Sequence, residues 1–598
     1  MFFNNLFYFL VVIFVLSTNS APESPRISPA IALPLTLLLF SFYSYFCNRI
    51  FGRVQNGSAS AYFKAERTLS IVAVGMFVFI LYFFDLKYYL HPLSIGDRLP
   101  VLENIGGICF FAGFLMVMWA RARRYYQAVF QRSYSIAKFV AANSKINLPI
   151  ILPWLVLSLF FDLLSLFDIP FVNKVLATYW GDLILFVIFV LFLLFFFPPL
   201  VRWLWNCKPM PQGPLRSEIE FFFRKQHFFS DILIWPLFEG QVITAGVMGV
   251  IPGLRYVLVT PALLQTMNWS ELEAVLAHEI GHVKKKHILL YLVLFLGFSI
   301  LAGAAVEPLP YLILSSDLFY AFPAWIKIAP DVLLAVLVAA PFLIFMLVYF
   351  RFIFGYFIRN FERQADLHVF KVQNESAPLI NSFEKIALLS GNTREQKNWH
   401  HFGIGERITF LEQCEQNRSL ISKHDRKVNF SLIVYFLLIT VSVGMLRQVD
   451  FEKLAAGNEA RYIEAVVMHK LYQEPDNSLW LLLLGDLMQE RKMEEKAIDA
   501  YEKALQLDPV NADIHNNLAW LLLTAQNSSL LDPSRALVLA GRAAELKQKG
   551  YIYDTLAVAL WANGRVDDAV AVEMRAIEID PDNKEFYLNQ LKMIKNRK

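Results

Sequence analysis

Long apolar runs limit most strongly what this chain can fold into. An α-helix needs about 20 apolar residues to cross a hydrocarbon core of about 30 Å. Nine runs approach or exceed that length, at residues 4–17, 29–47, 69–90, 105–120, 148–167, 181–201, 288–314, 331–358 and 429–446. Hydrophobic residues make up 56% of the 598 residues and charged residues only 18%. The sequence therefore predicts a mainly α-helical protein that crosses a lipid bilayer several times.

Basic residues in the loops predict how these spans are oriented, because positive loops stay in the cytoplasm. The loops after the second and fourth runs are rich in such residues: Arg49, Arg53, Lys64, Arg67, Arg121, Arg123, Arg124, Arg132, Lys138 and Lys145. Counting spans from these loops places residues 202–287 and 359–428 in the cytoplasm. The last run, 429–446, is short. We expect it to cross, which places residues 450–598 outside. If it is instead a buried or re-entrant helix, they remain inside.

Charge and cysteine content argue against a nucleic-acid-binding protein and against a disulfide-stabilised one. The net charge of +4 is too small to indicate nucleic-acid binding, and none is expected. No pair of cysteines has the Cys-x-x-Cys spacing, so a disulfide framework is not implied. The four cysteines are Cys47, Cys109, Cys207 and Cys414.

The segment His278-Glu279-Ile280-Gly281-His282 has the spacing of a zinc site. Histidines four residues apart lie on one face of a helix and can bind one ion. Zinc lowers the pKa of a bound water to about 7, and Glu279 is placed to take its proton. Ser270 and Glu273 have capping-box spacing, which predicts that the helix begins at Glu271. A chance match on an amphipathic helix is the alternative.

Residues 202–287 also contain three short strand patterns, at 232–235, 242–247 and 254–260. Pro252-Gly253 is a turn signal between the last two. A small sheet before the metal helix is a layout of zinc peptidases, in which an exposed strand pairs with extended substrate. A purely structural hairpin is the alternative.

A third zinc ligand is expected after the eighth apolar run. Arg359, Glu362 and Asp366 fall on one helical face by their spacing of three and four residues. Glu362 is suited to a His₂Glu site that leaves one position for water. Asp366 can hold a ligand imidazole in one tautomer. Spacing alone is equally consistent with an ordinary charged helix face.

Together, the two motifs resemble those of the integral-membrane zinc peptidases that include the type I CAAX prenyl proteases and the bacterial HtpX heat-shock proteases. The resemblance covers roughly residues 210–415, and two spans separate the motifs as in that family. It implies a gluzincin-like peptidase domain with one Zn²⁺ per chain, held by His278, His282 and Glu362. It also implies that Glu279 is the catalytic carboxylate.

Two weaker family patterns suggest further site residues. A histidine followed six residues later by Arg-Ile matches His401 and Arg407, which implies that His401 stabilises the oxyanion or acts as a latch. Arg407 is a further candidate for that role, and His400 is an adjacent alternative to His401. The Asn-Ala of the family's substrate strand is replaced by Thr244-Ala245, followed by Gly246. The other histidines discussed are expected to be structural: His227, His287, His368 and His424.

Residues 450–598 contain a repeat. Ala497, Tyr501, Ala504 and Pro509 fit the small-residue pattern of a tetratricopeptide repeat (TPR), whose period is about 34 residues, and the pattern returns near Pro581. About three repeats are expected, forming an α-solenoid whose concave face binds a peptide or protein partner. An unrelated array of α-hairpins is the alternative.

These patterns predict a polytopic membrane protein with units at 1–201, 202–428, 429–446 and 450–598. The expected activity is zinc-dependent cleavage of membrane proteins or lipid-associated peptides. The resemblance favours membrane-protein quality control in a bacterial inner membrane over CAAX-type processing of a defined peptide. A non-catalytic TPR scaffold with structural zinc is the alternative, although an intact Glu279 and an open water position argue against it.

Overall fold

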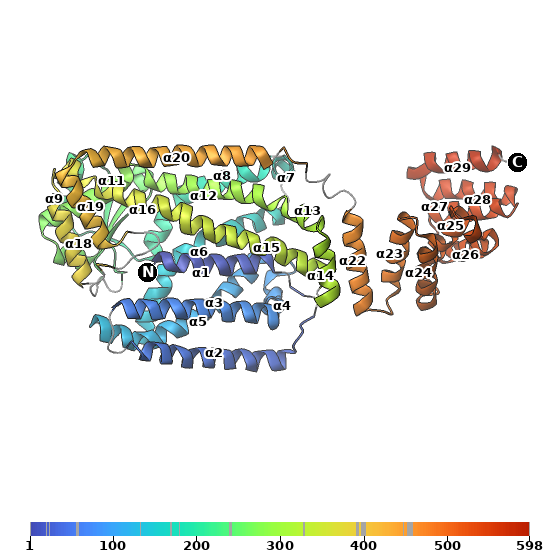
Figure 1. Ribbon diagram of the computed structural model, residues 1–598, viewed down its shortest axis with the longest axis horizontal. Coiled ribbons are helices and arrows are strands. Elements are labelled where there is room, and N and C mark those ends of the chain that lie inside the picture. The colour runs from blue at the N-terminus through green and yellow to red at the C-terminus, as the bar shows by residue number, and fades with distance from the viewer. Residues whose placement is uncertain are drawn as a thin grey trace. The chain divides into compact units, whose positions relative to one another are not determined.

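The structure is a computed structural model (Figure 1). It describes residues 2–19, 21–22, 24–54, 59–131, 133–167, 170–178, 180–237, 242–326, 329–389, 394–395, 402–446, 448–450 and 458–596. The chain forms two compact units. The first combines residues 1–305 with 339–446, and the second combines residues 306–338 with 447–598.

Eight helices among the described residues are long and apolar enough to cross a membrane. They correspond to α2 (Pro29–Gly52), α3 (Ala59–Phe83), α5 (Pro100–Phe130), α6 (Ile136–Phe167), α8 (Gly181–Leu204), α12 (His287–Val306), α15 (Pro330–Val348) and α20 (Ser419–Leu446). The expected mainly α, multi-spanning fold is confirmed. The expected number of nine spans is not, because the first run forms only a shorter apolar helix, α1 (Phe2–Thr18).

The first helices of the chain pack around an aromatic core. α1, α2, α3, α5 and α6 bury Tyr43, Tyr62, Phe111 and Phe114 almost completely. Short helices α4 (Leu86–Leu90) and η1 (His91–Ser94) connect α3 to α5, and α7 (Pro170–Leu176) precedes α8. Close van der Waals packing of this kind holds helices together in lipid, where apolar burial alone gives little.

A four-stranded sheet precedes the metal helix. Its strands are β1 (Lys208–Pro209), β2 (Asp231–Ile234), β3 (Ala245–Met248) and β4 (Tyr256–Val259), in the order β1-β2-β4-β3. β4 runs parallel to β2 and antiparallel to β3, and all four of its residues are buried. β3 is half-buried at the edge. The three predicted strands are therefore present, although the second begins only at Ala245.

Short helices surround this sheet and lead into the metal helix, α11 (Trp269–Lys284). They are α9 (Pro214–Lys225), η3 (Pro252–Leu254) and α10 (Pro261–Thr266). The prediction that α11 begins at Glu271 is wrong. Asn268 is the N-cap: its side chain accepts from the Glu271 amide at 2.9 Å, and the Glu271 carboxylate accepts from the Asn268 amide at 3.0 Å. This reciprocal pair starts the helix two residues earlier.

The second half of the peptidase region returns from the membrane to α11. A π-helical segment, η4 (Tyr349–Phe354), joins α15 to α16 (Gly355–Asp366). π-helical turns are rare and occur frequently at functional sites. Three further helices, α17 (Val369–Val372), α18 (Ala377–Leu389) and α19 (Ile404–Gln416), lead to α20. In Figure 1, α12, α15 and α20 run alongside one another away from the sheet.

The second unit contains the predicted repeats. Three helix pairs among its described residues are α23 (Ser478–Glu490) with α24 (Glu494–Leu507), α25 (Ala512–Thr524) with α26 (Pro533–Leu546), and α27 (Gly550–Ala562) with α28 (Val566–Ile579). α22 (Asn458–Gln473) precedes them and α29 (Lys584–Asn596) follows. Gly485 allows close packing, because a Cβ there would lie 2.3 Å from the Tyr501 ring. A short turn, η5 (Ser528–Leu530), connects α25 to α26, and η6 (Pro581–Asn583) precedes α29.

The same unit includes α13 (Leu309–Leu314) and α14 (Asp317–Ile326), which lie in sequence between α12 and α15. Tyr320 donates to the Asn458 carbonyl at 3.2 Å, and Arg461 donates to Asp317 at 2.9 Å. The segment between the two spans is therefore packed against the first helix of the repeat region.

Candidate metal centre

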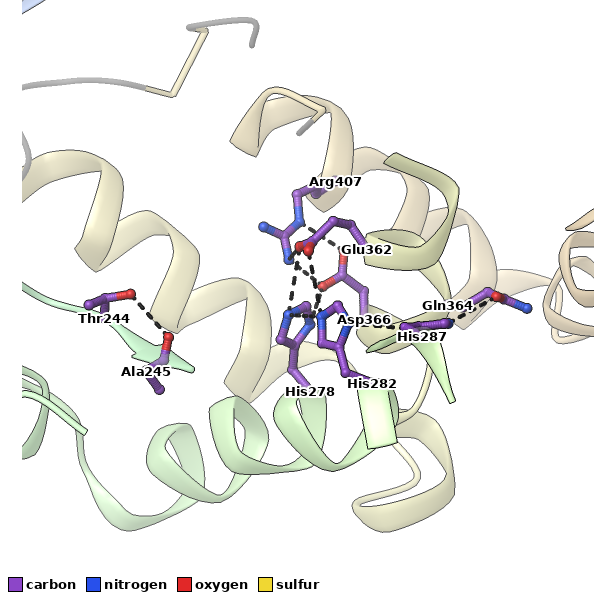
Figure 2. Close-up of polar contacts among 9 residues, drawn as sticks. All are labelled: Thr244, Ala245, His278, His282, His287, Glu362, Gln364, Asp366 and Arg407. Atoms are coloured by element: carbon purple, nitrogen blue, oxygen red, sulfur yellow. Dashed lines mark hydrogen bonds and ion pairs between the residues drawn. The ribbon is translucent and has the colours of Figure 1, made fainter. Parts of the chain in front are cut away.

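Three ligand atoms converge where α11 packs against α16 (Figure 2). The Nε2 atoms of His278 and His282 lie 3.3 Å apart. Oε2 of Glu362 lies 3.8 Å from Nε2 of His278, and Oε1 of Glu362 lies 3.5 Å from Nε2 of His282. Tetrahedral zinc with bonds of about 2.0–2.1 Å requires ligand atoms about 3.3–3.4 Å apart. The three residues therefore fit zinc and leave a fourth position for water or substrate.

Gly281, between the two histidines, allows the helices to approach this closely. A Cβ at position 281 would lie 2.9 Å from Cβ of His368 and 3.0 Å from the Ala365 backbone. Any larger residue would push α16, and with it Glu362, away from the histidines. The glycine in the motif is therefore explained by packing between α11 and α16.

Asp366 orients the first ligand. Its Oδ1 lies 2.9 Å from Nδ1 of His278, which holds the ring proton on Nδ1 and leaves Nε2 free for a metal. Arg407, on α19, donates to Asp366 at 2.8 Å and lies 3.8 Å from Glu362 (Figure 2). Burial opposes the charge on both side chains, but Asp366 raises the pKa of His278, and Asp366 with Glu362 raises the pKa of Arg407. Arg407 thus gives both buried carboxylates a cationic partner.

The second ligand is oriented by a different set of groups. Burial lowers the pKa of His282 to about 4, so the ring stays neutral and able to coordinate. Its Nδ1 lies 3.1 Å from Nδ1 of His287, whose Nε2 lies 3.2 Å from Gln364 (Figure 2). Gln364 donates to Asp425 on α20 at 2.7 Å. These contacts join α11, α12, α16 and α20 behind the ligand.

His287, which was expected to be structural, thus contacts the side of His282 that faces away from the metal position. An uninterrupted α11 would carry position 287 away from His282. The helix ends at Lys284, and Lys286 has the left-handed φ of 59°, which turns the chain back and stacks His287 on Phe361 at 4.6 Å. The one sequence signal for this arrangement is a pair of polar residues, Gln364 and Asp425, beside apolar runs.

Glu279 lies between the ligands and the sheet. It is buried, and burial raises the pKa of its carboxyl, whereas His278 lowers it. A hydrogen bond from the Val247 backbone on β3 also favours its charged form. The edge strand and the carboxylate that follows the first ligand are therefore direct neighbours.

The remaining predicted site residues fall into three groups. Thr244 immediately precedes β3, its amide and carbonyl bond the Thr260 side chain, and Ala245 and Gly246 are on the strand. Arg359 is half-buried, with its guanidinium over the Phe402 ring at 5.9 Å. His400 and His401 lie outside the described residues.

The other histidines have distinct surroundings. His368 is buried beside Gly281, and His424 is buried with Nε2 3.1 Å from the Asn360 carbonyl. The carbonyl of His227 accepts from Lys284 at 3.4 Å. That these three are structural stays a prediction.

Comparisons with known proteins agree with this organisation. Residues 236–424 match the family model of peptidase family M48. Residues 494–524 match a TPR repeat model, and residues 550–583 match a tetratricopeptide repeat model. Among solved structures, the crystal structure of S. mikatae Ste24p matches with 18% identity and a TM-score of 0.35, over 65% of this chain and 100% of that one. A search of curated proteins gives no match.

These matches exclude an unrelated array of α-hairpins for the C-terminal region. The chain is therefore a multi-pass membrane protein in which residues 236–424 match peptidase family M48 and the C-terminal region carries TPR repeats.

Proposed function

We propose that this protein is a zinc-dependent endopeptidase acting on membrane proteins or membrane-associated peptides. The observation that carries the proposal is the convergence of His278, His282 and Glu362 at zinc-ligand separations, with Glu279 beside them. Three protein ligands with one open position are typical of catalytic zinc rather than structural zinc.

The chain's own residues can perform the proton transfers of peptide hydrolysis. Bound zinc supplies Lewis-acid polarisation of water and of the scissile carbonyl. Burial raises the pKa of Glu279, which makes its carboxylate a stronger base for the proton of the attacking water. The protonated Glu279 then delivers that proton to the leaving amine. Arg407 and His401 are the candidates for stabilising the oxyanion.

The edge strand β3 supports an extended substrate. Among the described residues it pairs only with β4, so its other side can pair with a peptide backbone. Backbone pairing reads little side-chain sequence, which favours many substrates over one. A role in membrane-protein quality control follows from this breadth, and the continuity of α12, α15 and α20 with the site suits substrates drawn from the bilayer.

The decisive experiment compares the wild-type protein with Glu279→Gln, both purified in detergent with zinc. Cleavage of an unfolded membrane protein should fall by about 10²–10⁴ in the variant, the usual contribution of a general base. Zinc content should be unchanged. Equal cleavage by the two proteins would refute the peptidase assignment and favour a scaffold.

We further propose that the TPR repeats and the zinc site lie on opposite sides of the membrane. α20 begins at the site, where Lys285 contacts Asp425 at 2.6 Å, and its 28 residues extend about 42 Å, enough to cross. The segment 306–338, which joins the far ends of α12 and α15, belongs to the same compact unit as the repeats. The basic loops favour a cytoplasmic zinc site, which supports repeats on the outside.

This arrangement is tested by placing a cysteine at Ser529 in a background without the four native cysteines. A membrane-impermeant thiol reagent should label it in intact cells. Labelling that requires opening of the membrane would return the repeats to the cytoplasm. A cysteine at Ser419, at the start of α20, is the matched control and should react only after opening.

A further inference from the structure

The concave face of the repeats contains a groove of about 470 Å³ that the proposed peptidase chemistry does not use. The first helices of successive repeats, α23, α25 and α27, line it together with α29. The lining residues are Asp486, Gln489, Glu490, Asn516, Asn517, Trp520, Tyr551, Asp554, Thr555 and Phe586. Three of these are carboxylates and none is lysine or arginine, so the groove is acidic.

Two buried polar groups in the groove lack a donor. Asp554 is 5% exposed and Asn516 is 6% exposed, and the Oδ1 atom of each receives no hydrogen bond among the described residues. Leaving a buried acceptor unpaired costs about 1–3 kcal/mol, and more if it is charged. A ligand that brings a donor into the groove would recover part of this cost.

A second acid lies behind Asp554. Glu573, on α28, is 0% exposed, and neither of its oxygens receives a hydrogen bond among the described residues. Burial raises the pKa of both carboxyls, and the Asp554 carboxylate raises the pKa of Glu573 further. The raised pKa values favour a protonated Glu573 beside an ionised Asp554, and no cation neutralises the Asp554 carboxylate among the described residues, in contrast to the acids at the metal centre.

The rim of the groove suits a cation attached to an apolar stem. Trp520, Tyr551 and Phe586 provide aromatic faces, on which lysine and arginine side chains stack favourably. The nearby Lys547 is already engaged, since it donates to Asp513 at 2.8 Å. It is therefore not available to neutralise the groove.

Another lining residue, Asp486, is held in place by hydrogen bonds. It accepts from the Tyr501 hydroxyl at 2.7 Å and from Asn517 at 2.8 Å. Asn516 and Asn517 add amide groups of the kind that bond an extended backbone.

We propose that this groove binds an extended peptide segment of a partner protein through a lysine or arginine side chain. The cation lies against Asp554, with Asp486 and Glu490 adding long-range attraction, and its stem contacts the aromatic rim. The inference does not depend on zinc chemistry, because the groove is a separate site within the second unit.

Binding is tested on the full-length protein in detergent, carrying Glu279→Gln so that no probe is cleaved. The probes are short fluorescent Gly/Ser peptides that carry two arginines, two citrullines or two glutamates. Citrulline has the shape of arginine without its charge. The arginine peptide should bind about tenfold or more tightly than the citrulline peptide, and the glutamate peptide should not bind.

Variants then locate the binding site. Asp554→Asn and, separately, Glu490→Gln on the exposed rim should weaken arginine-peptide binding, the first by about tenfold and the second by about twofold. Asp499→Asn removes one carboxylate from α24, outside the groove lining, and should leave binding unchanged. Equal binding of the citrulline or glutamate peptide, an equal loss in Asp499→Asn, or no binding of any peptide would each overturn the proposal. Glu490→Gln retains this discrimination if Asp554→Asn does not fold.

Discussion

The metal centre and the TPR groove both bury carboxylates, but they compensate them differently. At the metal centre, Asp366 contacts His278 and Arg407, and Glu362 lies near both histidines and Arg407. In the groove, Asp554 and Glu573 face each other without a cation among the described residues. Buried charge is costly unless it is paired. The buried charges of the metal centre are therefore paired before any ligand binds. In the groove, a positively charged partner would supply the missing pairing.

Removing a proposed metal ligand should have the largest effect on the metal centre. In Glu362→Ala the site loses its only carboxylate ligand, and both zinc content and cleavage should fall to background. Metal analysis of the purified protein, together with an activity assay, checks this. Stoichiometric zinc with activity intact in this variant would show that another residue is the third ligand.

Removing a group that orients a ligand should have a smaller effect. Asp366→Asn keeps the size of the side chain but loses the charge that holds His278 and pairs with Arg407. Zinc affinity or turnover should fall by about 10–100-fold, the usual cost of losing such a partner. Titration with a competing chelator measures the affinity. Arg359→Lys on the same helix, whose guanidinium lies over Phe402, should stay within about threefold of wild type.

The contact between His287 and His282 should contribute less to zinc affinity than Asp366 does. His287→Phe preserves an aromatic ring stacked on Phe361 but loses the polar contacts to His282 and Gln364. Zinc affinity should fall by about tenfold, at the lower end for such positions. An unchanged affinity with a lower melting temperature would make His287 a structural residue only.

These residues also show how far the sequence predicts the site. The convergence of His278, His282 and Glu362 was predictable because helical spacing and a family resemblance both pointed to these residues. His287 was not, since its position depends on the left-handed conformation of Lys286, which helical periodicity does not indicate. The start of α11 was misplaced because Asn268 and Ser270 are both good caps, and tertiary packing selects between them.

For the fold, too, the sequence predicted some features and not others. Apolar length predicted the spans, and small-residue spacing predicted the repeats, because both depend on local sequence. The pairing of Asp554 with Glu573 was not predictable in this way. It arises only when α27 and α28 close as a hairpin, which brings together acids that belong to different helices.

The smallest expected effect concerns the stability of the repeats. The pKa of Glu573 is raised in the folded state, so the folded protein keeps a proton that the unfolded chain, with a glutamate pKa of about 4.3, has released. Folded stability is therefore highest at acidic pH and falls as pH rises from the unfolded pKa towards the raised folded one. Tyr587 on α29, which interacts with both acids, has a raised pKa and stays neutral across this range.

Glu573→Gln should remove this dependence, because the amide cannot ionise and can donate to Asp554. The measurement is amide hydrogen exchange of α27 and α28 in the full-length protein, comparing variant and wild type at each pH so that intrinsic exchange rates cancel. The variant should exchange more slowly than wild type at pH 8, by about tenfold or more, and similarly to wild type at pH 5. Faster exchange of the variant at pH 8 would mean that the carboxylate has a partner after all, and the contrast between the two regions would not hold.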